Sequence, residues 1–107
     1  EEAGIESYVE RQREFSLRTF GPGNRTMGLI AHICKELKEI EESPSDLFEW
    51  IDVVILAFDG AWRAGYEPQQ IAAALTEKAR TNHLRTWPDW RTVDVDQPIE
   101  HIRHAIE

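Results

Sequence analysis

The sequence predicts an all-α protein: a four-helix-bundle-like fold with a short extra C-terminal helix, forming one domain over residues 1–107. Apolar residues recur at spacings of three and four in four successive segments, as they do in helices with one buried face. Helix-breaking residues separate these segments at 20–24, at 43–45 and at Pro68. The four helices are therefore expected to be joined by short connections.

The first helix is expected at residues 5–18 and the second at residues 25–42. Ile5, Val9 and Phe15 lie near helical spacing in the first segment, and Asn24 is suited to cap the second. An apolar stripe runs along the second segment and consists of Met27, Ile30, Cys34 and Leu37. This stripe predicts the core-facing side of the second helix, with the cysteine as a small core residue.

The third helix is expected at residues 46–64, with Ser45 as its N-cap and Gly65 as its stop. It is the most apolar segment. The β-branched run 51–55 is also compatible with a strand, but the length and the apolar spacing favour a helix. The fourth helix is expected at residues 68–84, with Pro68 in its first turn, and the short last helix at 99–106.

Composition limits the classes of function. A formal net charge of −8 argues against nonspecific nucleic-acid binding, which requires cations to replace phosphate counterions. One cysteine excludes an intrachain disulfide and a thiolate zinc cluster, so we expect a reducing, cytoplasmic compartment. No apolar run approaches the roughly 20 residues that span a bilayer, so no membrane partner is expected. Because the chain opens on Glu1 rather than Met, a processed or trimmed N-terminus is expected.

Two pairs of carboxylates are the main candidate site. Glu36 and Glu39 are three residues apart, as are Glu49 and Asp52, so each pair projects from one face of its helix. A short connection favours antiparallel neighbours, which can direct both pairs into one space. Crowded carboxylates need a cation among them, and hard oxygen ligands select Mg²⁺ or Mn²⁺.

The alternative is an ordinary solvated acidic surface, because helix surfaces commonly carry Glu. Glu49 and Asp52 lie in the most apolar segment, where a free carboxylate is costly, and Asp59 repeats the position of Asp52 seven residues later. A carboxylate stripe along a core helix needs a partner, and a metal ion is one of few that fit. Spacing alone leaves both interpretations open.

Basic and aromatic residues are candidates for substrate contacts. Lys78, Asn82 and Arg85 share one helix face, which suits an oligophosphate but also an ordinary solvated surface. His32 lies one turn before Glu36, and Arg25 extends the same stripe. These two residues are candidates for substrate contact, and the alternatives are a satisfied histidine and a surface ion pair. The aromatic candidates for stacking on a base or for packing are Phe15, Phe20, Trp87 and Trp90.

Two runs of sequence carry a family resemblance. Residues 35–41 and 46–57 resemble the ExxE…ExxD signature of the MazG-like all-α nucleoside triphosphate pyrophosphohydrolases. Residues 18–23, 59–65, 78–91 and 99–102 are similar to the phage and bacterial dATP/dGTP diphosphohydrolase-like branch of that superfamily. The resemblance therefore covers nearly the whole chain.

The resemblance implies hydrolysis of a (deoxy)nucleoside triphosphate, dGTP or dATP, to the monophosphate and pyrophosphate. It implies two or three Mg²⁺ or Mn²⁺ ions, and assigns metal binding and catalysis to Glu36, Glu39, Glu49 and Asp52. Glu36 is our candidate for aligning or deprotonating the attacking water. Lys78 and Asn82, with Arg85, are implied to approach the substrate phosphates or sugar.

The resemblance also implies a homodimer or homotetramer with sites near subunit interfaces, in the host cytoplasm if a phage encodes the chain. Only nine residues separate Glu39 from Glu49, which is shorter than in much of the superfamily, so base selectivity does not carry over. Two alternatives stay open. One is a hydrolase that removes noncanonical nucleotides, and the other is a non-catalytic helical interaction module.

Overall fold

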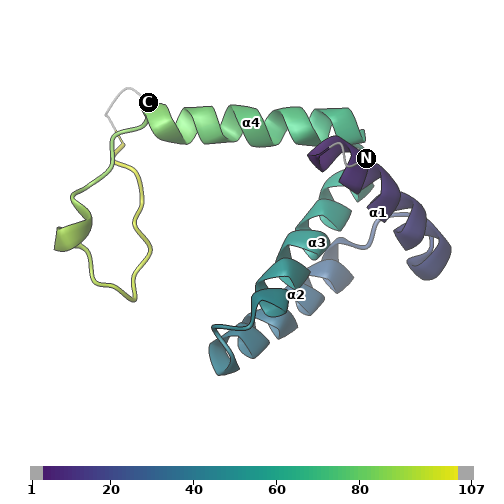
Figure 1. Ribbon diagram of the computed structural model, residues 1–107, viewed down its shortest axis with the longest axis horizontal. Coiled ribbons are helices and arrows are strands. Elements are labelled where there is room, and N and C mark those ends of the chain that lie inside the picture. The colour runs from purple at the N-terminus through teal and green to yellow at the C-terminus, as the bar shows by residue number, and fades with distance from the viewer. Residues whose placement is uncertain (1–3, 104–107) are drawn as a thin grey trace. The chain divides into compact units, whose positions relative to one another are not determined.

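The computed structural model describes residues 4–103 and contains four α-helices (Figure 1). They are α1 (Ile5–Phe20), α2 (Thr26–Glu42), α3 (Leu47–Arg63) and α4 (Pro68–Leu84), followed by a short 3-10 helix at Trp90–Thr92. No strand occurs within residues 4–103, which confirms the all-α prediction. Within the same residues, no helix combines the length and the apolar character needed to cross a bilayer.

The chain divides into two compact units, residues 1–73 and 74–107, and the division falls inside α4. In the first unit α3 packs against both α1 and α2. The buried apolar side chains of the first unit are Val9, Ile40 and Ile71. The rings of Tyr8 and Phe58, whose centres are 5.9 Å apart, add a contact between α1 and α3. The interior is small, so much of the apolar surface of α2 and α3 stays exposed.

Local chemistry explains where the helices begin and end. The N-cap of α2 is Arg25, so the prediction of Asn24 was wrong by one residue, although the Asn24 side chain accepts a hydrogen bond from the Thr26 backbone N–H at 2.8 Å. The N-cap of α3 is Asp46, whose side chain accepts from the Phe48 N–H at 3.0 Å, so the prediction of Ser45 was wrong by one residue. Gly65 follows the end of α3 with a φ of +109°, a conformation that glycine adopts without strain.

The predicted apolar stripe of α2 is not its packed face. Met27, Ile30 and Leu37 are 74%, 47% and 48% exposed, and Cys34 is exposed rather than in the core. The residues of α2 that are buried or half-buried are Leu29, Ile33, Glu36, Glu39 and Ile40. Because this face carries carboxylates, it looked more polar than the neighbouring stripe, and periodicity alone selected the wrong one.

The second unit continues from α4 into an irregular segment. The Trp87 indole N–H donates to the Asn82 carbonyl at 2.8 Å, and the Ile102 N–H donates to the Thr86 carbonyl at 2.7 Å. Residues 99–103 are not helical, so the predicted last helix was wrong there, and residues 104–106 lie outside the described chain. So short a segment has too few turns to repay the cost of helix nucleation, and Ile102 instead donates its hydrogen bond to Thr86.

Candidate metal centre

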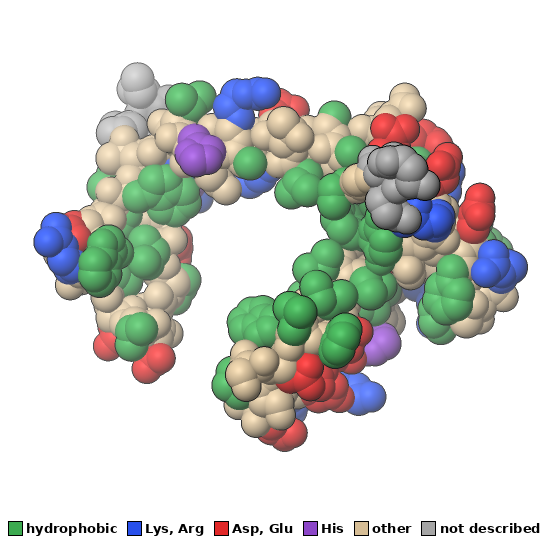
Figure 2. Space-filling view, viewed as in Figure 1, with side chains coloured by type: hydrophobic (Ala, Val, Ile, Leu, Met, Phe, Trp, Pro, Cys, Tyr) green, Lys and Arg blue, Asp and Glu red, His purple; other side chains and the backbone are tan. Residues whose placement is uncertain are grey.

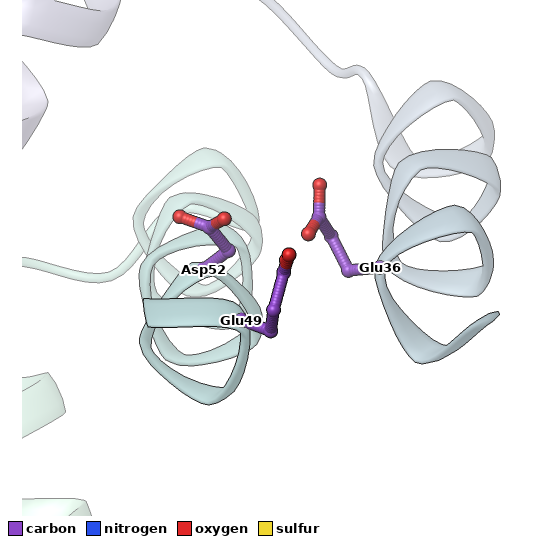
Figure 3. A group of neighbouring side chains, drawn as sticks. All are labelled: Glu36, Glu49 and Asp52. Atoms are coloured by element: carbon purple, nitrogen blue, oxygen red, sulfur yellow. The ribbon is translucent and has the colours of Figure 1, made fainter. Parts of the chain in front are cut away.

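Three carboxylates from two helices converge in the first unit. Glu36 on α2 and Glu49 and Asp52 on α3 each offer an oxygen, and these oxygens lie within 4.8 Å of one another (Figure 3). Glu36 and Glu49 point into the space between the two helices, and Asp52 lies on the α3 side of that space. Glu49 belongs to the first turn of α3, where the positive end of the helix dipole favours a carboxylate. The expectation that the two pairs reach one space therefore matches the geometry for three of the four carboxylates.

Glu36 is the buried member of the group. Its side chain is 8% exposed, and its Oε1 atom has no hydrogen-bond partner among the described residues. Its Oε2 atom lies 3.4 Å from Nε2 of His32, one turn earlier on α2. A buried carboxylate oxygen without a donor is costly, and a bound cation would supply the missing partner.

Glu39 lies beside this group and acts on Glu49. Partial desolvation, followed by a hydrogen bond and like charge from Glu39, raises the pKa of Glu49 to about 7. The charge of Asp46 and a hydrogen bond with Glu36 act in the same direction. Such crowding of carboxylates favours protonation of one of them, or binding of a cation, near neutral pH.

The donor set suits a hard divalent ion. The group contains only carboxylate oxygens, which favour Mg²⁺ or Mn²⁺ over softer metals. A cation at this place would give the unpartnered Oε1 of Glu36 a ligand bond, and it would offset the negative charges that raise the pKa of Glu49. The residues present therefore fit the expected metal.

Asp59 does not belong to the convergent group. It is 4% exposed, and its carboxylate accepts hydrogen bonds from Ser16 at 2.7 Å, Trp62 at 3.0 Å and Gln12 at 3.4 Å. Burial and then the charge of Asp59 raise the pKa of Tyr8, whose hydroxyl donates to Gln12 at 3.3 Å. The sequence interpretation missed these α1 partners, although Tyr8, Gln12 and Ser16 recur at four-residue spacing on one face.

Arg63 at the end of α3 extends this polar network. One Nη atom donates to Oγ of Ser16 at 2.9 Å and the other to the Gly23 carbonyl at 3.0 Å. Its guanidinium lies 4.4 Å from the centre of the Trp62 ring. Arg63 therefore fastens the α1–α2 loop to α3, a role that no spacing in the sequence signalled.

A cavity connects the carboxylates to this network. It has a volume of about 280 Å³, and its lining includes Gln12, Phe15, Phe20, Glu36, Asp52 and Asp59. His32 lines the same cavity and also a smaller neighbouring one of about 90 Å³, which Arg25 and Arg63 line as well. Of the two site candidates outside the carboxylates that lie in this unit, His32 borders the cavity that Glu36 lines, and Arg25 borders the neighbouring one.

The sequence model of the dATP/dGTP pyrophosphohydrolase family matches residues 8–106. The chain belongs to this family. It is also similar to the Eaa protein of Salmonella phage P22, with 37% identity over 64 residues, which are 60% of this chain and 19% of that protein. The chain thus spans about a fifth of the length of that curated relative. The comparison with solved structures gave no significant match.

In this member of the dATP/dGTP pyrophosphohydrolase family, the remaining predicted substrate residues lie in the second unit. Lys78 and Asn82 are one turn apart on α4, and Lys78 is exposed. The Asn82 side-chain oxygen accepts from Nη1 of Arg85 at 3.2 Å, so these two residues are brought together.

Family membership confirms the resemblance found in the sequence.

Proposed function

We propose that the chain hydrolyses dATP or dGTP to the monophosphate and pyrophosphate with the help of divalent metal ions. The observation that carries the proposal is the convergence of Glu36, Glu49 and Asp52 within 4.8 Å, in a chain of the dATP/dGTP pyrophosphohydrolase family. The family match runs across both units, which supports one catalytic domain over the whole chain.

The metal ligands in this proposal are Glu36, Glu39, Glu49 and Asp52. Two or three Mg²⁺ or Mn²⁺ ions, when bound, would neutralise triphosphate oxygens and lower the pKa of water. Glu36 is also proposed to align or deprotonate the attacking water through the carboxylate oxygen that does not bind a cation, and its burial, which excludes bulk solvent, supports this role. Glu39, whose charge acts on Glu49, completes the ligand set.

Five residues are proposed to bind the substrate phosphates or sugar: Lys78, Asn82, Arg85, Arg25 and His32. Cations offset the charge that develops on a triphosphate during phosphoryl transfer. The hydrogen bond between Asn82 and Arg85 orients the guanidinium, which supports a role for that pair in phosphate binding. His32 borders the cavity that Glu36 lines, and Arg25 borders a neighbouring cavity that His32 also lines, which supports contact of both with the same substrate.

We also propose that the active form is a homodimer or homotetramer. Large apolar side chains stay exposed along α2 and α3 (Figure 2), among them Met27, Phe48 and Trp50 at 74%, 75% and 51%. Apolar surface of this kind is commonly covered by a second copy. The nucleotide substrate and the phage relative support action in a cytoplasm, that of the host if a phage encodes the chain.

The function is tested by incubating the protein with each of the four dNTPs and with Mg²⁺ or Mn²⁺. We expect equimolar dNMP and pyrophosphate from dATP or dGTP, no reaction after chelation, and no turnover by folded Glu39→Gln or Asp52→Asn. Glu10→Gln on the exposed surface of α1 is the matched control and should retain activity. Absence of pyrophosphate from every dNTP would refute the proposal, and a higher kcat/KM for a deaminated or oxidised nucleotide would assign the noncanonical substrates instead.

A further inference from the structure

The cavity between α1, α2 and α3 has one feature that catalysis at the carboxylates does not require: an aromatic and amide lining. Phe15, Phe20 and Gln12 border the same hollow as Glu36 and Asp52. We propose that this cavity holds the purine base of the substrate, and that Gln12 is the residue that recognises the edge of the base. The inference rests on the function proposed above and adds to it the group that reads the base.

Two phenylalanine rings form the apolar wall of the cavity. Phe15 and Phe20 are 45% and 53% exposed, and their centres are 6.0 Å apart in an edge-to-face arrangement at 84°. Ile55 and Leu56 complete the apolar lining from α3. Exposed aromatic rings that border a cavity are stabilised when a flat apolar group covers them, and a nucleotide base is such a group because it stacks on aromatic side chains.

The orientation of the Gln12 amide is set by its neighbours. The Asp59 carboxylate accepts from the amide nitrogen at 3.4 Å, and the Tyr8 hydroxyl donates to the amide oxygen at 3.3 Å. Both contacts are long for hydrogen bonds. Together they use one N–H and one oxygen lone pair of the amide, so a second N–H and a second lone pair are left for a ligand.

Asp59 itself is poorly placed to read a base. It already accepts short hydrogen bonds from Ser16 and Trp62, at 2.7 and 3.0 Å, and is 4% exposed. Gln12 is only half-buried and faces the cavity. Asp59 thus acts as a positioning residue for Gln12, and the amide is the group available to substrate.

An amide explains how one site accepts two purines. Adenine presents an amino donor beside the N1 acceptor, and guanine presents the O6 acceptor beside the N1–H donor. One donor and one acceptor on Gln12 match either pair, since turning the base over exchanges the two positions. A carboxylate, which only accepts, would match the adjacent N1–H and 2-amino donors of guanine and leave adenine with one unmatched acceptor.

The test is equilibrium binding of α,β-imido analogues of dATP and dGTP in the presence of Mn²⁺, with tripolyphosphate as the probe without a base. We expect Gln12→Met and Phe15→Ala to weaken binding of both analogues by about tenfold and to leave tripolyphosphate unchanged. Gln12→Glu should weaken the dATP analogue more than the dGTP analogue. The matched controls, Gln69→Met and Tyr66→Ala at exposed positions, should change none of these dissociation constants.

The inference is overturned if folded Gln12→Met and Phe15→Leu bind both analogues as the wild type does. It is also overturned if the wild type binds tripolyphosphate as tightly as the nucleotide analogues. Failure of the proposed function looks different: base-dependent binding would persist, while no dNTP would release pyrophosphate. Pyrophosphate release with binding that does not depend on Gln12 or Phe15 would keep the function and discard the base site.

Discussion

Replacing Asp59 with asparagine removes the charge from a buried side chain that accepts hydrogen bonds from Gln12, Ser16 and Trp62. Oγ of Ser16 donates to this carboxylate at 2.7 Å and at the same time accepts from Arg63 at 2.9 Å. An amide nitrogen facing Ser16 cannot accept from the hydroxyl, and its N–H would compete with Arg63 for the Ser16 oxygen. Because a hydrogen bond to a charged group contributes about 1.5–3 kcal/mol, we expect Asp59→Asn to lower the free energy of unfolding by about 2 kcal/mol.

A loss of this size is a large part of the stability of a small domain, which is about 5–15 kcal/mol. Urea unfolding followed by far-UV circular dichroism should show a midpoint lower by about 1 M. The control Glu10→Gln makes the same carboxylate-to-amide change at an exposed position of α1 and should stay within about 0.5 kcal/mol of the wild type. If Asp59→Asn also stays within that range, the network does not hold α1 to α3 and the reasoning fails.

Three further outcomes follow from the carboxylate group and from α4. Glu36→Gln removes a buried charge next to other carboxylates, so it should raise the melting temperature of the chelated protein and abolish the stabilisation that Mn²⁺ gives the wild type; an unchanged Mn²⁺ shift would remove Glu36 from the ligands. The pKa of Glu49 is raised to about 7, so its contribution to metal-free stability is complete below about pH 4.5 and is lost as the pH rises through 7. The loss is measured as the pH dependence of the difference in unfolding free energy between chelated wild type and chelated Glu49→Gln. The Mn²⁺ affinity of the wild type should rise over the same pH interval, because binding needs the ionised form of Glu49. A difference and an affinity that both stay constant with pH would contradict the assignment. Lys78→Ala and Arg85→Ala should each lower kcat/KM for the preferred dNTP by about 10- to 100-fold without changing the Mn²⁺ shift, and wild-type kinetics in both would exclude these side chains from the substrate site.

Local patterns in the sequence were sufficient for the helices. Apolar spacing, Pro68 and Gly65 placed four helices close to their observed bounds, because periodicity and helix-breaking residues act over a few neighbouring positions. The convergence of Glu36 with Glu49 and Asp52 was also predictable, since a short connection between two helices leaves few ways to arrange them. The same local logic failed at residues 99–103, where a bond to the distant Thr86 carbonyl replaced the helix.

Only the tertiary structure decided which side of each helix meets a partner. The face of α2 with Glu36 packs in place of the more apolar stripe with Met27, and Asp59 is held by Gln12 and Ser16 of α1 rather than joining the other carboxylates. The first choice depends on the opposing surface of α3, and the second on pairs of residues more than forty positions apart, as in the hydrogen bonds between α1 and Asp59. The periodicity of one helix carries no information about such pairs, because burial and hydrogen bonding are settled by the opposing helix.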